Sequence, residues 1–132
     1  MQSISGIIYL ILGACLLPYI FTLIAKKSAG LTAQDHQNPR EALAKATGIA
    51  ARANAVQQNS FESLPLFIAA VLMAEYMVIP QSFIMILGVA YLLLRIIYGI
   101  CYLANWATLR SIIWTLSMLC PICLLLLIIK TV

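Results

Sequence analysis

Long uncharged apolar runs dominate the pattern of this chain. Residues 1–25 and 76–94 carry no charged side chain, and between residues 96 and 129 the only charge belongs to Arg110. A membrane-spanning helix needs about 20 mostly apolar residues, whereas transmembrane β-strands show short alternating segments. The continuous runs therefore predict an all-α membrane protein, with four spans at about 5–25, 43–77, 82–103 and 110–129.

Polar segments separate the predicted spans. A loop with charged and turn-forming residues runs from Lys26 to about Arg40, one long helix is predicted from Glu41 to Met77, and short turns lie near residues 78–81 and 105–108. Pro18 falls inside the first span, where neighbouring helices can satisfy the carbonyl that it frees. We interpret the whole chain, 1–132, as a single four-helix membrane domain.

Composition strengthens the membrane assignment. The hydrophobic fraction is 64% and the charged fraction 9%, against about 45–50% and about 25% in soluble domains. The first run lacks a basic leading segment and a small-residue cleavage site, so we interpret it as a retained span and not as a signal peptide. The net charge of +4 is small and dispersed, a pattern that does not favour nucleic-acid binding.

Basic residues gather in alternate connections. The second connection has no Lys or Arg, the third has Arg110, and the first has more basic than acidic residues, namely Lys26, Lys27, Arg40 and Lys45 against Asp35 and Glu41. An excess of Lys and Arg marks the cytoplasmic side. The first and third connections are therefore expected in the cytoplasm and both termini outside.

Polar side chains inside two spans converge in the cytoplasmic half of the membrane. Such residues are expensive in lipid and are candidates for function. Arg52 and Asn59 lie within about 20° of each other around their helix. The third span carries an i, i+4, i+7, i+11 stripe that defines one helix face: Tyr91, Arg95, Tyr98 and Tyr102.

An unpaired carboxylate at the depth of Glu62 is unfavourable, so we expect Arg95 or Arg52 to pair with it. The cluster then has two interpretations. It is either a structural ion-pair network that fixes helix register, or a site for an anionic ligand, because positive charge remains after Glu62 is paired.

Three stretches resemble the MAPEG family, the membrane-associated proteins in eicosanoid and glutathione metabolism. Residues 52–67 resemble its second-helix motif, R-x6-N-x-x-E-x-x-P-x-F, through Arg52, Asn59, Glu62, Pro65 and Phe67. The run from Arg95 to Tyr102, followed by Arg110-Ser111, looks like the third-helix motif and the start of the fourth helix. Asn38-Pro39-Arg40 looks like the N-P-R that precedes helix two in many members.

The resemblance implies a homotrimer of four-helix protomers in a bacterial inner membrane, with glutathione bound between subunits near the cytoplasmic side. Membrane lipids and a lipophilic small-molecule substrate are the other implied partners, and no metal is implied. Arg110 aligns, after one extra residue, with an arginine proposed to stabilise the thiolate, and it forms the implied catalytic pair with Tyr102. The implied glutathione-binding residues are Arg40, Arg52, Gln57, Asn59, Glu62, Arg95, Tyr98 and Tyr102.

The implied function is that of a glutathione transferase-like enzyme, which conjugates small lipophilic electrophiles or reduces lipid hydroperoxides. A guanidinium or a tyrosine hydroxyl stabilises the thiolate that such chemistry needs. Many glutathione-using members carry a second arginine four residues before the motif asparagine, where this chain has Ala55. A non-catalytic membrane scaffold is therefore an open alternative.

The cysteines indicate another possible function, thiol redox chemistry in the membrane. Cys120 and Cys123 form a C-x-x-C, which indicates redox chemistry in a soluble βαβ setting. Four-helix membrane disulfide-forming enzymes also carry such pairs, with a quinone alongside. Cysteine mostly behaves as a small buried apolar residue, so packing beside Pro121 is the simpler interpretation. His36 is the single histidine and is expected at the surface, without a metal.

Overall fold

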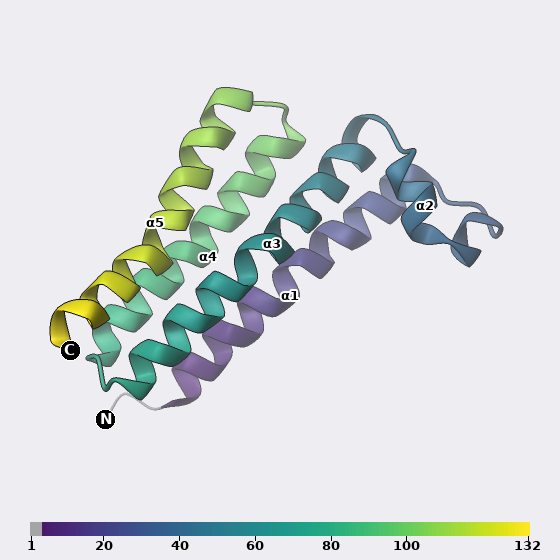
Figure 1. Cartoon of the computed structure of the whole chain (residues 1–132). Coiled ribbons are helices and arrows are strands. Elements are labelled where there is room, and N and C mark those ends of the chain that lie inside the picture. The colour runs from purple at the N-terminus through teal and green to yellow at the C-terminus, as the bar shows by residue number, and fades with distance from the viewer. Residues whose placement is uncertain (1–3) are drawn as a thin grey trace.

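The computed structural model describes residues 4–132, and one long helix overlaps each of the four predicted spans (Figure 1). A short 3-10 helix, η1 (Asp35–Gln37), and a short helix, α2 (Pro39–Ala44), lie in the first connection. The long helices are α1 (Ile4–Ala29), α3 (Gly48–Tyr76), α4 (Gln81–Leu103) and α5 (Ala107–Thr131). The all-α four-helix prediction is thus confirmed, and α1 continues through Pro18 without a break.

The long helices form two neighbouring pairs, α1 with α3 and α4 with α5, and α3 and α4 join the pairs (Figure 1). Two glycines of α4 allow α1 to approach closely. A Cβ added to Gly88 would overlap Leu10, and one added to Gly99 would overlap the ring of Phe21. Small residues at such crossings let membrane helices pack by direct contact, so these glycines set the spacing between α1 and α4.

Three of the described helices, α1, α4 and α5, are long and apolar enough to cross a membrane. Their outward sides expose large apolar side chains such as Ile8, Ile86 and Leu126. Exposed apolar surface on this scale is unfavourable in water and is natural in lipid. The protein is therefore an integral, multi-pass membrane protein, and α3 is the polar member of its bundle.

The prediction of one continuous helix from Glu41 to Met77 is wrong. Helix α2 ends at Ala44 and α3 begins at Gly48. Gly48 has a φ of 63°, in the left-handed region that glycine adopts without steric cost, and Thr47 is extended with ψ 168°. The break turns the chain between α2 and α3, so α2 lies against the ends of α1 and α3.

The connections sort to the two ends of the bundle. The α1–α3 connection and the α4–α5 turn lie at one end, while the start of α1, the α3–α4 turn and the end of α5 lie at the other (Figure 1). At the first end, Arg52 Nε donates to the carbonyl oxygen of Leu103 at 3.1 Å. Carbonyls in the last turn of a helix lack an intrahelical partner, so this bond ties α3 to the end of α4.

Candidate functional site

A polar pocket of about 470 Å³ opens where α3, α4 and α5 meet. We call it the tyrosine pocket. Tyr98 and Tyr102 are one helical turn apart on α4, and their ring centroids lie 5.7 Å apart in an edge-to-face arrangement. The guanidinium carbon of Arg110 lies 4.3 Å from the centroid of the Tyr102 ring, within cation–π range. The lining residues are Asn59, Tyr98, Tyr102, Arg110, Ser111, Trp114 and Thr115.

The tyrosine pocket is rich in hydrogen-bond donors. Ser111 and Thr115 donate their hydroxyls to carbonyls of α5 at 3.1 and 3.0 Å. The guanidinium of Arg110, the two tyrosine hydroxyls and the amide of Asn59 remain for a ligand. None of the described lining residues is acidic. The pocket is therefore suited to a ligand with carbonyl and carboxylate oxygens.

Arg95 lies behind this pocket and not on its surface. Its side chain is only 1% exposed. Its Nη2 donates to Asn59 Oδ1 at 2.8 Å and to Ser60 Oγ at 3.0 Å, and its guanidinium carbon lies 4.2 Å from the centroid of the Tyr98 ring. Its Nε and Nη1 have no partner among residues 4–132. The cation is thus buried among neutral groups, and two of these, Asn59 and Tyr98, line the pocket.

The expected ion pair of Glu62 with Arg95 or Arg52 is wrong. Arg95 binds Asn59 and Ser60, Arg52 binds the carbonyl of Leu103, and the described chain contains one ion pair, between Lys45 and Glu41. Glu62 is exposed. Around α3, it points about 60° away from Asn59 and about 160° away from Ser60, and its carboxylate forms no ion pair with either arginine in the described chain.

A second polar pocket, of about 520 Å³, lies between α1, α2 and α3. We call it the lysine–arginine pocket. Its lining residues with polar side chains are Tyr19, Thr22, Lys26, Arg40, Asn54, Gln57 and Gln58. Gln57 and Asn59 are two positions apart on α3, so their side chains point about 160° apart. Within one chain, therefore, Gln57 and Arg40, which were predicted to bind glutathione, do not reach the tyrosine pocket.

A stripe of α3 separates the two polar pockets. It includes Glu62, Pro65 and Ala69, all of which are exposed. Glu62 lies fourteen residues from each end of α3, or about 21 Å at 1.5 Å per residue. The carboxylate is therefore exposed at the middle of the helix, and Ala55 is half-buried near its start.

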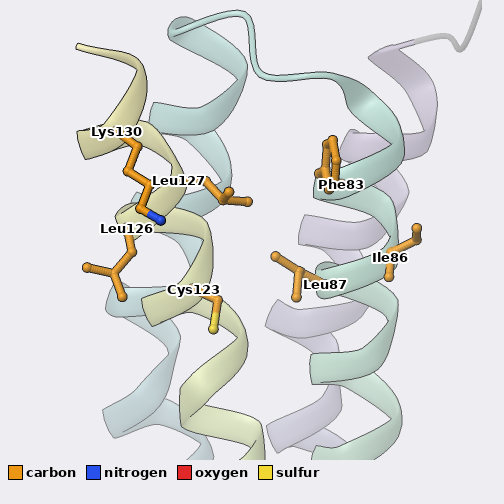
Figure 2. A pocket seen from close by; sticks show the side chains of 7 residues that line it. All are labelled: Phe83, Ile86, Leu87, Cys123, Leu126, Leu127 and Lys130. Atoms are coloured by element: carbon orange, nitrogen blue, oxygen red, sulfur yellow. The ribbon is translucent and has the colours of Figure 1, made fainter.

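An apolar groove of about 440 Å³ lies between α4 and α5, near the end of the bundle that holds the chain termini (Figure 2). Its lining residues are Phe83, Ile86, Leu87, Cys123, Leu126, Leu127 and Lys130. The thiol of Cys123 is exposed there, while Cys120 is buried and its Sγ lies 3.6 Å from the carbonyl oxygen of Leu116. The two thiols of the C-x-x-C thus face different surroundings and form no disulfide in this structure.

The pocket residues that the sequence did not single out are Trp114 and Thr115 of α5. Trp114 follows Arg110 by four positions, and Thr115 follows Ser111 by four positions, so each continues the helix face of a pocket residue one turn earlier. That spacing was available in the sequence, but hydroxyl and indole side chains near a membrane boundary are common and indicate no particular site.

Comparison with protein families matches residues 6–130 to the MAPEG family. Comparison with curated proteins and with solved structures gives no match. Members of this family are typically glutathione-dependent membrane enzymes and are often trimeric. Their fold has four membrane-spanning helices, so α3 spans the membrane together with α1, α4 and α5. The match covers nearly all of the chain, as the motifs on its second and third long helices indicated: the protein belongs to the MAPEG family.

Proposed function

We propose that the protein is a glutathione transferase- or peroxidase-like enzyme that acts on small lipophilic electrophiles or lipid hydroperoxides. The observation that carries this proposal is the tyrosine pocket, where Asn59, Tyr98, Tyr102 and Arg110 come together from three helices. These are four of the residues that the family motifs assign to glutathione and its thiolate. They meet in a family of glutathione-dependent proteins.

The donor set fits glutathione. The tripeptide presents two carboxylates, two amide carbonyls and a thiol, and the pocket supplies a guanidinium, two phenol hydroxyls and a carboxamide without an acidic lining residue. Hydrogen bonds between charged donors and carboxylates are about twice as strong as neutral ones. Glutathione would supply the sulfur nucleophile, and the electrophile would enter from the lipid.

Arg110 is the residue best placed to stabilise a thiolate. It lies in the first turn of α5, where the helix dipole also favours negative charge. A guanidinium close to a thiol lowers the cost of its deprotonation, and donors fixed before the reaction stabilise developing charge most effectively. Tyr102, against which Arg110 packs, limits the positions that the guanidinium can take and offers its own hydroxyl.

A second copy of the chain would complete this site. Glu62 is exposed at the middle of α3, and a carboxylate facing lipid at that depth is expensive. Cover by another subunit removes that cost. It would also place the lysine–arginine pocket of a neighbour, with Arg40 and Gln57, beside the stripe that borders the tyrosine pocket. We therefore propose a homotrimer with glutathione between subunits, in which Glu62 contacts the ligand or the neighbour.

Calorimetric titration of the detergent-purified protein with glutathione tests this function. We expect binding in the parent protein and in Cys123→Ser. We expect Arg110→Ala to reduce turnover of a lipophilic electrophile by roughly 100-fold or more without a matching loss of protein yield. Lys130→Ala removes a cation from the other end of α5 and is the matched control.

Two outcomes would contradict the proposal. Absence of binding up to millimolar glutathione would leave the non-catalytic scaffold. Activity that survives Arg110→Ala and disappears in Cys123→Ser would point to thiol redox chemistry at the apolar groove instead.

A further inference from the structure

We infer that Arg95 is a positioning residue, which fixes the carboxamide of Asn59 so that its amide N–H groups, and not its oxygen, face the ligand. This inference rests on the proposed glutathione site. It assigns Arg95 a role different from direct glutathione binding, and it specifies which kind of ligand atom Asn59 accepts.

The orientation of Asn59 follows from the chemistry of its partner. A guanidinium has five N–H donors and no acceptor. Arg95 Nη2 lies 2.8 Å from the side-chain amide of Asn59, so only the oxygen of that amide can face it. Most asparagine amides leave the choice between oxygen and nitrogen to the wider hydrogen-bond network. Here the neighbour alone decides it, and Nδ2 is left without a partner in the described chain.

The surroundings of Arg95 keep it in this role. Its side chain is 1% exposed and lines neither polar pocket. Ser60 accepts from the same Nη2 at 3.0 Å, and the ring of Tyr98 covers the guanidinium. Breaking this hydrogen bond would leave a further N–H group of a buried cation poorly satisfied, which is unfavourable. The bond to Asn59 is therefore costly to exchange for a ligand, and Asn59 cannot turn its oxygen towards the pocket.

The consequence is a preference for acceptors. At Asn59, the pocket presents two N–H donors to the ligand, so the ligand group that binds there is a carbonyl or carboxylate oxygen. The ammonium group of glutathione would face two donors at this position and is excluded from it. Asn59 therefore binds the peptide through one of its oxygens, and the ammonium must be held elsewhere.

Asn59→Asp tests the orientation. The carboxylate keeps the shape and still accepts from Arg95, but it presents an acceptor to the pocket. We expect glutathione affinity to fall roughly 10- to 100-fold, which is the change in affinity that corresponds to the loss of one hydrogen bond to a charged group. Asn105→Asp, the same change in the exposed α4–α5 turn, should bind like the parent. Equal or tighter binding in Asn59→Asp would mean that the oxygen faces the ligand, and would overturn the inference.

A double-mutant cycle of Arg95→Met and Asn59→Ala tests the positioning role. If Arg95 acts through Asn59, the double variant loses less glutathione affinity than the product of the two single losses. Losses that multiply would mean independent contacts with the ligand and would overturn the inference. Arg95→Lys replaces Arg95→Met in the cycle if the latter does not fold.

Thermal unfolding of the same four proteins in detergent separates this inference from the proposed function. Coupling between the two positions is expected in the melting temperatures without any ligand. If the parent protein binds no glutathione, the proposed function fails, while coupled melting temperatures would still support the contact that orients Asn59. Additive shifts in melting temperature would overturn the inference whatever the protein binds.

Discussion

Ala55 stands at the residue position where the resemblance to glutathione-using members of the family leads us to expect an arginine. It lies four residues before Asn59 on α3, one turn away on a neighbouring face, and it is half-buried near the exposed stripe. Viewed along the helix axis, this position lies between Asn59 and Glu62, one to two turns closer to the start of α3. Among the described lining residues of the tyrosine pocket, Arg110 is the cation.

We predict that Ala55→Arg tightens glutathione binding by roughly tenfold, because a guanidinium forms charge-assisted hydrogen bonds with a carboxylate. Isothermal titration of the variant and the parent measures the change. Ala55→Gln has a long side chain without the charge and is the control. Unchanged affinity in Ala55→Arg would show that the ligand carboxylates lie out of reach of this turn.

At the residue scale, helical spacing predicted the stripe of Arg95, Tyr98 and Tyr102, and the structure confirms that Arg95 and Tyr98 are buried together. The expected partner of Glu62 could not be predicted in the same way. Spacing gives the direction of a side chain, while pairing depends on the rotation of each helix in the bundle. Arg95 reaches the side of α3 that carries Asn59 and Ser60, away from Glu62.

At the scale of elements, the crossing of α1 and α4 depends on glycine. We predict that Gly99→Ala destabilises the protein by about 1–3 kcal/mol, the usual cost of overpacking a tight core, because the added Cβ would overlap the ring of Phe21. Gly13→Ala is the matched control, since its Cβ would lie 3.4 Å from Leu92 Cδ1. Thermal unfolding in detergent compares the two, and equal melting temperatures would contradict the prediction.

The four long helices could be predicted because each apolar run is long, uncharged and bounded by polar residues. The break between α2 and α3 could not be predicted from the same pattern. Alanine and lysine around residues 42–46 favour helix, and the apolar spacing continues across them. The local signal for a helix break was Thr47-Gly48. The chain turns there only because Gly48 adopts a positive φ, and this turn accompanies the packing of α2 against α1 and α3.

At the scale of the whole molecule, the exposed stripe of α3 is the surface that we expect another copy to cover. We predict that a cysteine introduced by Ala69→Cys, in a chain that also carries Cys123→Ser, is cross-linked between copies by a short bifunctional maleimide in native membranes. Ile8→Cys, on an outward side of α1, is the control. Equal cross-linking at both positions, analysed on denaturing gels, would argue against a subunit interface on α3.

The position of the two polar pockets on different sides of α3 has a genetic consequence. If each site combines the lysine–arginine pocket of one subunit with the tyrosine pocket of the next, Arg40→Ala and Arg110→Ala damage different halves. Each trimer that contains both variant chains then has one subunit interface at which an intact lysine–arginine pocket meets an intact tyrosine pocket. Random co-assembly of the two inactive chains should restore about a quarter of the parent activity, whereas a site contained within one chain would allow no complementation at all.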